Sequence, residues 1–147
     1  GSADLPDGSK LDLSTTCPIC NMKLEASNFG PAAIVLKDGK VVGFDGAGDL
    51  FRYLLSPEKQ TIKTADIKAI YVTEYGTRNF VDARTAYYVV GTNVTGDMGP
   101  EVVPFSKKEA AEQFKSEQNG KRVVAFLDVT LDDLKSGKKL LKMRHGH

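Results

Sequence analysis

The two cysteines of the chain, Cys17 and Cys20, lie in the segment TTCPICNMKLE at residues 15–25, and Met22 follows them closely. A pair of thiols can bind a metal, act as a redox dithiol or close a structural disulfide. A thioether is a soft donor, and a set of Cys and Met ligands favours Cu(I) over harder ions. Because Cu(I) accepts as few as about two or three soft ligands, these three residues would nearly complete its coordination sphere.

Three other interpretations of the cysteine pair stay open on spacing alone. A structural zinc site needs four ligands, and the only histidines, His145 and His147, lie in a C-terminal tail. His145 could reach a metal from there, although a histidine in a frayed tail is more often inert. A thioredoxin-like motif begins a helix after a strand, whereas this segment precedes every predicted strand. A disulfide across so short a loop would remove little chain entropy and so stabilise little.

A further methionine, Met98, lies in the Gly-containing loop TNVTGDMGPE at residues 92–101. A methionine at such a loop tip has no predicted core to fill. Two interpretations follow: the side chain closes over a neighbouring strand, or it supplies another thioether ligand.

The elements that would position these residues repeat along the chain. In the first half, strands are predicted at residues 32–36, 41–44 and 67–75, with a helix at 45–55. In the second half, the corresponding strands are predicted at residues 86–91, 102–105 and 121–129, with a helix at 106–118. A repeat of about 60 residues with the same order of elements indicates an internal duplication.

The predicted fold class is therefore α+β, with two homologous ββαβ modules whose helices cover small antiparallel sheets. The first module spans residues 15–76 and includes the cysteine loop, and the second spans residues 77–137. Residues 1–14 are rich in Gly, Pro, Asp and Ser and predict a flexible leader. Residues 138–147 predict a flexible tail.

The composition excludes several classes of function. At 147 residues, with 41% hydrophobic and 27% charged residues, the chain suits one domain or two small ones. A net charge of +1 gives no field that would attract nucleic acid, so no nucleic-acid partner is expected. No apolar run approaches the roughly 18 residues of a membrane span. The opening Gly1-Ser2 indicates a cloning remnant, so we expect an export signal to precede it.

Several motifs occur in an order that resembles the NosL family, the accessory proteins of nitrous oxide reductase. They are Cys-Pro-x-Cys-x-Met, Tyr-Gly-Thr, Asp-Ala-Arg-Thr-Ala, Gly-x-Met-Gly and a Pro-Phe pair before an alanine-rich helix, within residues 17–134. The resemblance implies two homologous ββαβ modules related to the organomercurial lyase fold. The family usually has Gly at the position of Asn21, and Asn tolerates the left-handed backbone that this turn requires.

The resemblance also implies a periplasmic lipoprotein that binds Cu(I) and delivers it to the copper centres of nitrous oxide reductase. Its partner would be the periplasmic component of an ABC-type membrane complex, and its lipid anchor would lie ahead of Ala3. Carried over to this chain, the ligands are the thiolates of Cys20 and Cys17 and the thioether of Met22. Met98 would be an additional ligand or a docking residue.

The predicted activity is binding and transfer of copper, not catalysis. The alternative is a Cys-based redox or lyase-type enzyme related to organomercurial lyase. Such an enzyme needs a thiol pair and an acid together in a buried pocket, whereas both thiols of this chain lie in one loop. A third possibility is a structural adaptor in which the cysteine pair has no chemical role.

Overall fold

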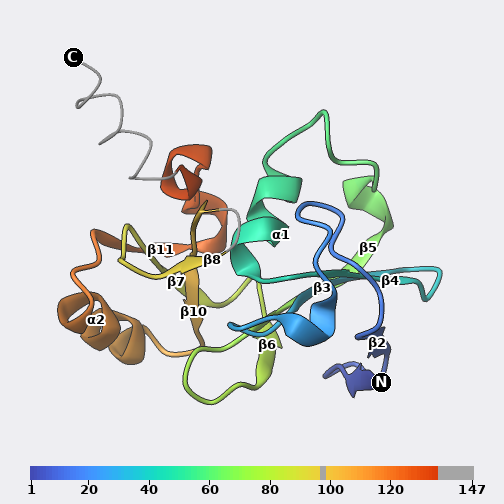
Figure 1. The fold of residues 1–147 in the computed structure, drawn as a ribbon, viewed down its shortest axis with the longest axis horizontal. Coiled ribbons are helices and arrows are strands. Elements are labelled where there is room, and N and C mark those ends of the chain that lie inside the picture. The colour runs from blue at the N-terminus through green and yellow to red at the C-terminus, as the bar shows by residue number, and fades with distance from the viewer. Residues whose placement is uncertain (97–98, 136–147) are drawn as a thin grey trace.

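The computed structural model describes residues 1–96 and 99–135, and Figure 1 shows two larger sheets with α1 between them. The described strands and helices are β1 (Ser2–Asp4), β2 (Lys10–Asp12), β3 (Ala32–Leu36), β4 (Val41–Phe44), α1 (Ala47–Leu54), β5 (Ile67–Thr73), β6 (Phe80–Asp82), β7 (Tyr87–Val90), β8 (Thr95–Gly96), β9 (Gly99–Pro100), β10 (Val103–Phe105), α2 (Lys108–Glu117) and β11 (Arg122–Ala125). Short 3-10 helices are η1 (Leu24–Ala26), η2 (Thr64–Asp66), η3 (Phe126–Asp128) and η4 (Leu131–Leu134).

The two larger sheets share one topology. The first has the strand order β4-β3-β5-β6 and the second has the order β10-β7-β11. In each sheet the earliest strand is flanked by its hairpin partner and by the strand that follows the helix, and these pairs are antiparallel. This arrangement confirms the α+β class and the repeated ββαβ order.

A tight turn aligns the first hairpin, β3–β4. Gly39 has a φ of 95°, and the Asp38 carboxylate accepts a hydrogen bond of 2.9 Å from the N–H of Lys40. Asp-Gly is the pair that such hairpin turns prefer, because the glycine takes the left-handed backbone without a side-chain clash. The turn sets the register in which Ala32 pairs with Phe44, directly before the start of α1.

Helix α1 lies in the interior rather than on one sheet. Every residue of α1 except Leu54 is buried. The Phe51 ring packs edge-on against Tyr88 of the second sheet, with centroids 5.0 Å apart, and it also contacts Phe126. Helix α2 buries only Ala111 and Phe114 and covers the outer face of the second sheet. The prediction that each helix covers its own sheet therefore holds for α2, while α1 packs against both halves.

The N-terminal segment differs from the predicted flexible leader. Strands β1 and β2 form an antiparallel hairpin, and Leu5 and Leu11 are 4% and 1% exposed in the main core. A Cβ built on Gly43 would lie 2.7 Å from the Cδ1 atom of Leu11, so the glycine makes room for this leucine. The leader prediction was wrong because two leucines in a polar stretch are enough to dock the hairpin on the first sheet.

Strand β6 lies beyond the predicted module boundary after residue 76, yet it pairs with β5 and extends the first sheet. The turn between β5 and β6 is linked to the second half of the chain through Glu74. Its carboxylate accepts hydrogen bonds from the Thr77 hydroxyl and from the backbone N–H of Ser106. The predicted tail at residues 138–147 lies outside the described residues.

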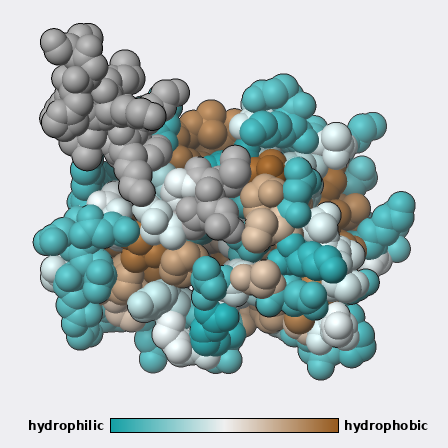
Figure 2. Space-filling view, in the orientation of Figure 1, coloured by the Kyte–Doolittle hydropathy of each residue, from teal (hydrophilic) through white to brown (hydrophobic). Residues whose placement is uncertain are grey.

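Polar side chains cover much of the face shown in Figure 2, with apolar side chains between them. Among the residues that the structure describes, no helix has the length and apolar character needed to cross a membrane.

Candidate metal centre

The cysteine loop is closed by its own backbone. Thr16 and Lys23 form an isolated antiparallel bridge, and the N–H of Cys17 donates to the carbonyl of Met22 at 2.9 Å. The N–H of Asn21 donates back to the carbonyl of Cys17 at 2.9 Å. Asn21 has a φ of 62°, which is the left-handed conformation expected at this position. These bonds hold both cysteines in one compact turn.

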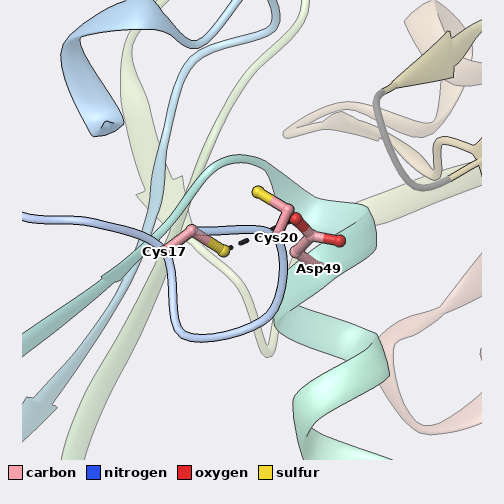
Figure 3. A group of neighbouring side chains, drawn as sticks. All are labelled: Cys17, Cys20 and Asp49. Atoms are coloured by element: carbon pink, nitrogen blue, oxygen red, sulfur yellow. Dashed lines mark hydrogen bonds between the residues drawn. The ribbon is translucent and has the colours of Figure 1, made fainter. Parts of the chain in front are cut away.

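The two sulfurs meet a carboxylate that lies far away in the sequence. The Sγ atoms of Cys17 and Cys20 and one carboxylate oxygen of Asp49 all lie within 4.8 Å of one another. Figure 3 shows the Cys17 thiol directed at Asp49, and this hydrogen bond to Oδ2 measures 3.5 Å. Cys17 and Asp49 are buried, Cys20 is half-buried, and both cysteines are free. The cluster therefore opens to the outside on the Cys20 side.

Asp49 lies in the first turn of α1, and a buried arginine balances its charge. The Oδ1 atom of Asp49 accepts a hydrogen bond of 3.1 Å from Nη1 of Arg52, one helical turn later. The Nη2 atom of Arg52 donates to the carbonyl of Pro100 at 2.9 Å and to that of Leu134 at 3.1 Å. Buried ion pairs need such additional partners. Here the partners come from the second half of the chain.

The N-terminus of α1 is capped from the second half as well. Gly46, at the N-cap position, makes no side-chain cap, and the carboxylate of Glu101 instead accepts the N–H of Gly48. A Cβ on Gly48 would lie 2.8 Å from Oε1 of Glu101, so only glycine allows this approach. Burial raises the pKa of Glu101 to about 7, although the Gly48 N–H and Arg52 oppose the rise.

Both thiols hold their protons more tightly than ordinary cysteines. Burial is the main cause that raises the pKa of Cys17, and backbone N–H groups of Cys20, Asp45 and Ile19 act in the opposite direction. Burial also raises the pKa of Cys20, and the hydrogen bond and charge of Asp49 add to the effect. A metal that binds here must therefore displace protons.

The structure brings together some of the predicted site residues. Cys17 and Cys20 lie together, and Met22 is 42% exposed at the outer edge of the same loop. Met98, His145 and His147 lie outside the described residues. Asp49 was missed by the sequence reasoning. The one available signal was its pairing with Arg52 three positions later in a helix that is otherwise apolar or small.

The donor set suits a soft metal ion. Two thiolates alone suit Cu(I). If the Asp49 carboxylate also binds, the set of two Cys and one Asp resembles the ligands of Zn(II) sites. By fold and site, the chain is thus a mixed α+β protein with a thiol–carboxylate cluster of the kind that binds metal ions.

Comparison with known proteins agrees with this class. The NosL family model matches residues 9–134, and the chain belongs to the NosL family. It is 33% identical over 124 residues to the copper-binding lipoprotein NosL of Achromobacter cycloclastes, and this alignment covers 76% of this chain and 61% of that relative. It is 28% identical over 142 residues to the copper-binding lipoprotein NosL of Stutzerimonas stutzeri, and this alignment covers 90% of this chain and 70% of that relative.

A solved structure supports the same assignment. The crystal structure of the copper chaperone NosL from Shewanella denitrificans matches with a TM-score of 0.67 and 32% identity, over 81% of this chain and 92% of that one. The resemblance noted from the motifs is therefore confirmed. The chain spans only 61% of the length of the Achromobacter relative, so the activity and partners of the whole protein are matters for proposal.

Proposed function

We propose that this chain carries Cu(I) and delivers it for the assembly of the copper centres of nitrous oxide reductase. The observation that supports this best is the cluster of two cysteine sulfurs beside Asp49, all within 4.8 Å of one another. Thiolates select soft monovalent copper over harder ions. Relatives named as copper-binding lipoproteins and as a copper chaperone agree with this function.

In this proposal Cys17 and Cys20 supply the thiolates and Met22 the thioether, with Met98 as a further ligand. Exposure rises from Cys17, which is 0% exposed, to Met22, which is 42% exposed. A partner's soft ligand would therefore approach from the Met22 side, before the buried Cys17 releases the ion. Such a site binds tightly against water and still allows exchange with a partner.

The proposed setting is the periplasm, with a lipid anchor on the full-length protein. The receiving partner would be the periplasmic component of an ABC-type complex and, through it, nitrous oxide reductase. The name lipoprotein carried by two relatives supports the anchor. The chain would act by binding and release and would not be an enzyme.

An anaerobic Cu(I) titration in competition with bathocuproine tests the ligand assignment. We expect stoichiometric binding by the reduced chain, a large loss in Cys20→Ser and in Cys17→Ser, and a smaller loss in Met22→Leu. His145→Ala serves as the control and should bind like the unmodified chain. Undiminished binding by a double Cys17→Ser/Cys20→Ser variant would refute the assignment. Tight binding of Zn(II) without any binding of Cu(I) would refute the assignment of Cu(I) as the bound metal.

One observation favours a second function, a lyase-type enzyme. The structure places a buried acid, Asp49, beside the two thiols, and a thiol pair with an acid is what such chemistry requires. In the reaction with an organomercurial acetate, both thiols bind Hg(II) and release two protons. One proton goes to the carbon as the carbon–mercury bond breaks, which gives the hydrocarbon, and the other leaves with the acetate as acetic acid. Incubation with phenylmercuric acetate and measurement of benzene tests this function. Benzene release that is lost in Asp49→Asn would favour the enzyme.

A further inference from the structure

Arg52 links the thiol cluster to the second half of the chain and has no role in the ligand set proposed above. The residue is 9% exposed. It belongs to α1, the helix that lies between the two larger sheets in Figure 1. Both oxygens of Asp49 are engaged, Oδ1 by Arg52 and Oδ2 by the Cys17 thiol. The guanidinium is held on its other side by the carbonyls of Pro100 and Leu134.

We infer that Arg52 is a specificity-determining residue, which neutralises Asp49 and so keeps the thiol pair selective for a monovalent soft ion over a divalent one such as Zn(II). This inference rests on the proposed copper-binding function and adds to it the basis for rejecting the competing metal.

The charge of the cluster supports the inference. With both thiols deprotonated, the cysteines and Asp49 would form a strongly anionic set that attracts a divalent ion more than a monovalent one. Arg52 adds a fixed positive charge next to that set, and its repulsion acts about twice as strongly on a divalent ion as on a monovalent one. Burial strengthens the effect, because little water screens the interaction.

The geometry of Asp49 works in the same direction. Zn(II) prefers four ligands and would recruit the carboxylate, which requires competition with the charge-assisted bond from Arg52. Cu(I) is satisfied by sulfur donors and leaves that bond intact. Because two backbone carbonyls anchor the guanidinium and its charge is permanent, the arginine cannot easily withdraw.

The test compares Cu(I) and Zn(II) affinities of the full reduced chain by chelator competition, using bathocuproine for Cu(I) and a chromophoric zinc chelator for Zn(II). Arg52→Gln keeps amide donors for the carbonyls but removes the charge, and we expect its Zn(II)-to-Cu(I) affinity ratio to rise by about tenfold or more. Arg52→Lys keeps a positive charge but loses the fork that reaches both carbonyls, and its ratio should rise less than that of Arg52→Gln. Arg122→Gln, which removes the Arg122–Asp133 pair of 2.8 Å elsewhere, is the matched control and should leave the ratio unchanged.

An equal loss of both affinities in Arg52→Gln would show that Arg52 is only structural and would overturn the inference. If that variant does not fold by circular dichroism, Asp49→Asn gives a second test. Removal of the carboxylate should lower the Zn(II) affinity more than the Cu(I) affinity, and an unchanged ratio would again overturn the inference. Failure of the unmodified chain to bind Cu(I) would overturn the proposed function itself. That result is distinct from a change in the variants alone, so the failure of the function and the failure of the inference can be told apart.

Discussion

Replacement of Glu101 by Gln should remove a pH dependence of stability that is built into the start of α1. Glu101 is 7% exposed, and its carboxylate accepts the N–H of Gly48 across the two halves of the chain. Burial is the main cause that raises its pKa, from 4.5 to about 7. Asp49 and Asp45 raise it further, whereas the Gly48 N–H and Arg52 lower it.

The sign of the effect follows from which state binds the proton. Below about pH 4.5 the group is protonated in both the folded and the unfolded chain, so it makes no difference to stability. As the pH rises from 4.5, the unfolded chain loses the proton while folded Glu101 keeps it until about pH 7. The free energy of unfolding therefore falls over this window, by roughly 3 kcal/mol in total, and then levels off.

The assay is urea unfolding of the reduced, metal-free chain, followed by circular dichroism from about pH 4.5 to about pH 7.5. Gln cannot ionise and keeps an oxygen that can accept the Gly48 N–H. The difference in unfolding free energy between Glu101→Gln and the unmodified chain should thus shift in favour of the variant by roughly 3 kcal/mol across the window. Glu109→Gln, at an exposed position of α2, is the control and should show no such shift. A pH-independent difference for Glu101→Gln would refute the reasoning.

Three further predictions concern the hairpin, the turn and the thiols. Leu11→Ala should lower the unfolding free energy by about 2–5 kcal/mol in urea titration, because Leu11 is 1% exposed in the core; a loss below about 0.5 kcal/mol would mean that the hairpin is not docked. Asn21→Ala should cost about 1 kcal/mol in the same assay because of its φ of 62°, while Asn21→Gly should cost nothing; equal effects of the two would contradict this. The apparent Cu(I) affinity should rise with pH below the raised pKa values of Cys17 and Cys20, by about tenfold per pH unit for each thiol that loses a proton; a flat profile from about pH 6 to about pH 8 would count against thiolate ligation.

The sequence predicted the regular elements well where local signals were strong. The predicted strands at residues 32–36 and 41–44 match β3 and β4, because buried apolar runs flank an Asp-Gly turn. The repeated order of elements also predicted the common topology of the two sheets. These features depend on residues that are neighbours in the chain, which is why a single sequence reveals them.

Features that depend on contacts between distant segments were missed. The N-terminal hairpin has few apolar residues, and its order comes from Leu5 and Leu11 docking in the main core. Because α1 contains Asp49 and Arg52, the sequence did not indicate a helix that is buried on nearly all sides. In the structure these two side chains are buried because Arg52 donates hydrogen bonds to Asp49 and to the backbone carbonyl of Pro100.

The candidate site was predicted only in part for the same reason. The spacing of Cys17 and Cys20 predicted a compact thiol pair, since a short loop alone determines how close they lie. The approach of Asp49 to Cys17 depends on how α1 packs behind the loop. Glu101 reaches Gly48 only because the second half of the chain folds back on the first. No periodicity or motif in one sequence encodes such encounters.

X-ray absorption spectroscopy of the Cu(I)-loaded, reduced chain tests most directly whether the cysteine loop is the copper site. We expect a first coordination shell of about two or three sulfur atoms, with loss of sulfur scattering in Cys17→Ser and in Cys20→Ser. A shell of nitrogen and oxygen atoms alone, or a sulfur shell that persists when both cysteines are replaced, would contradict the assignment of copper to this loop.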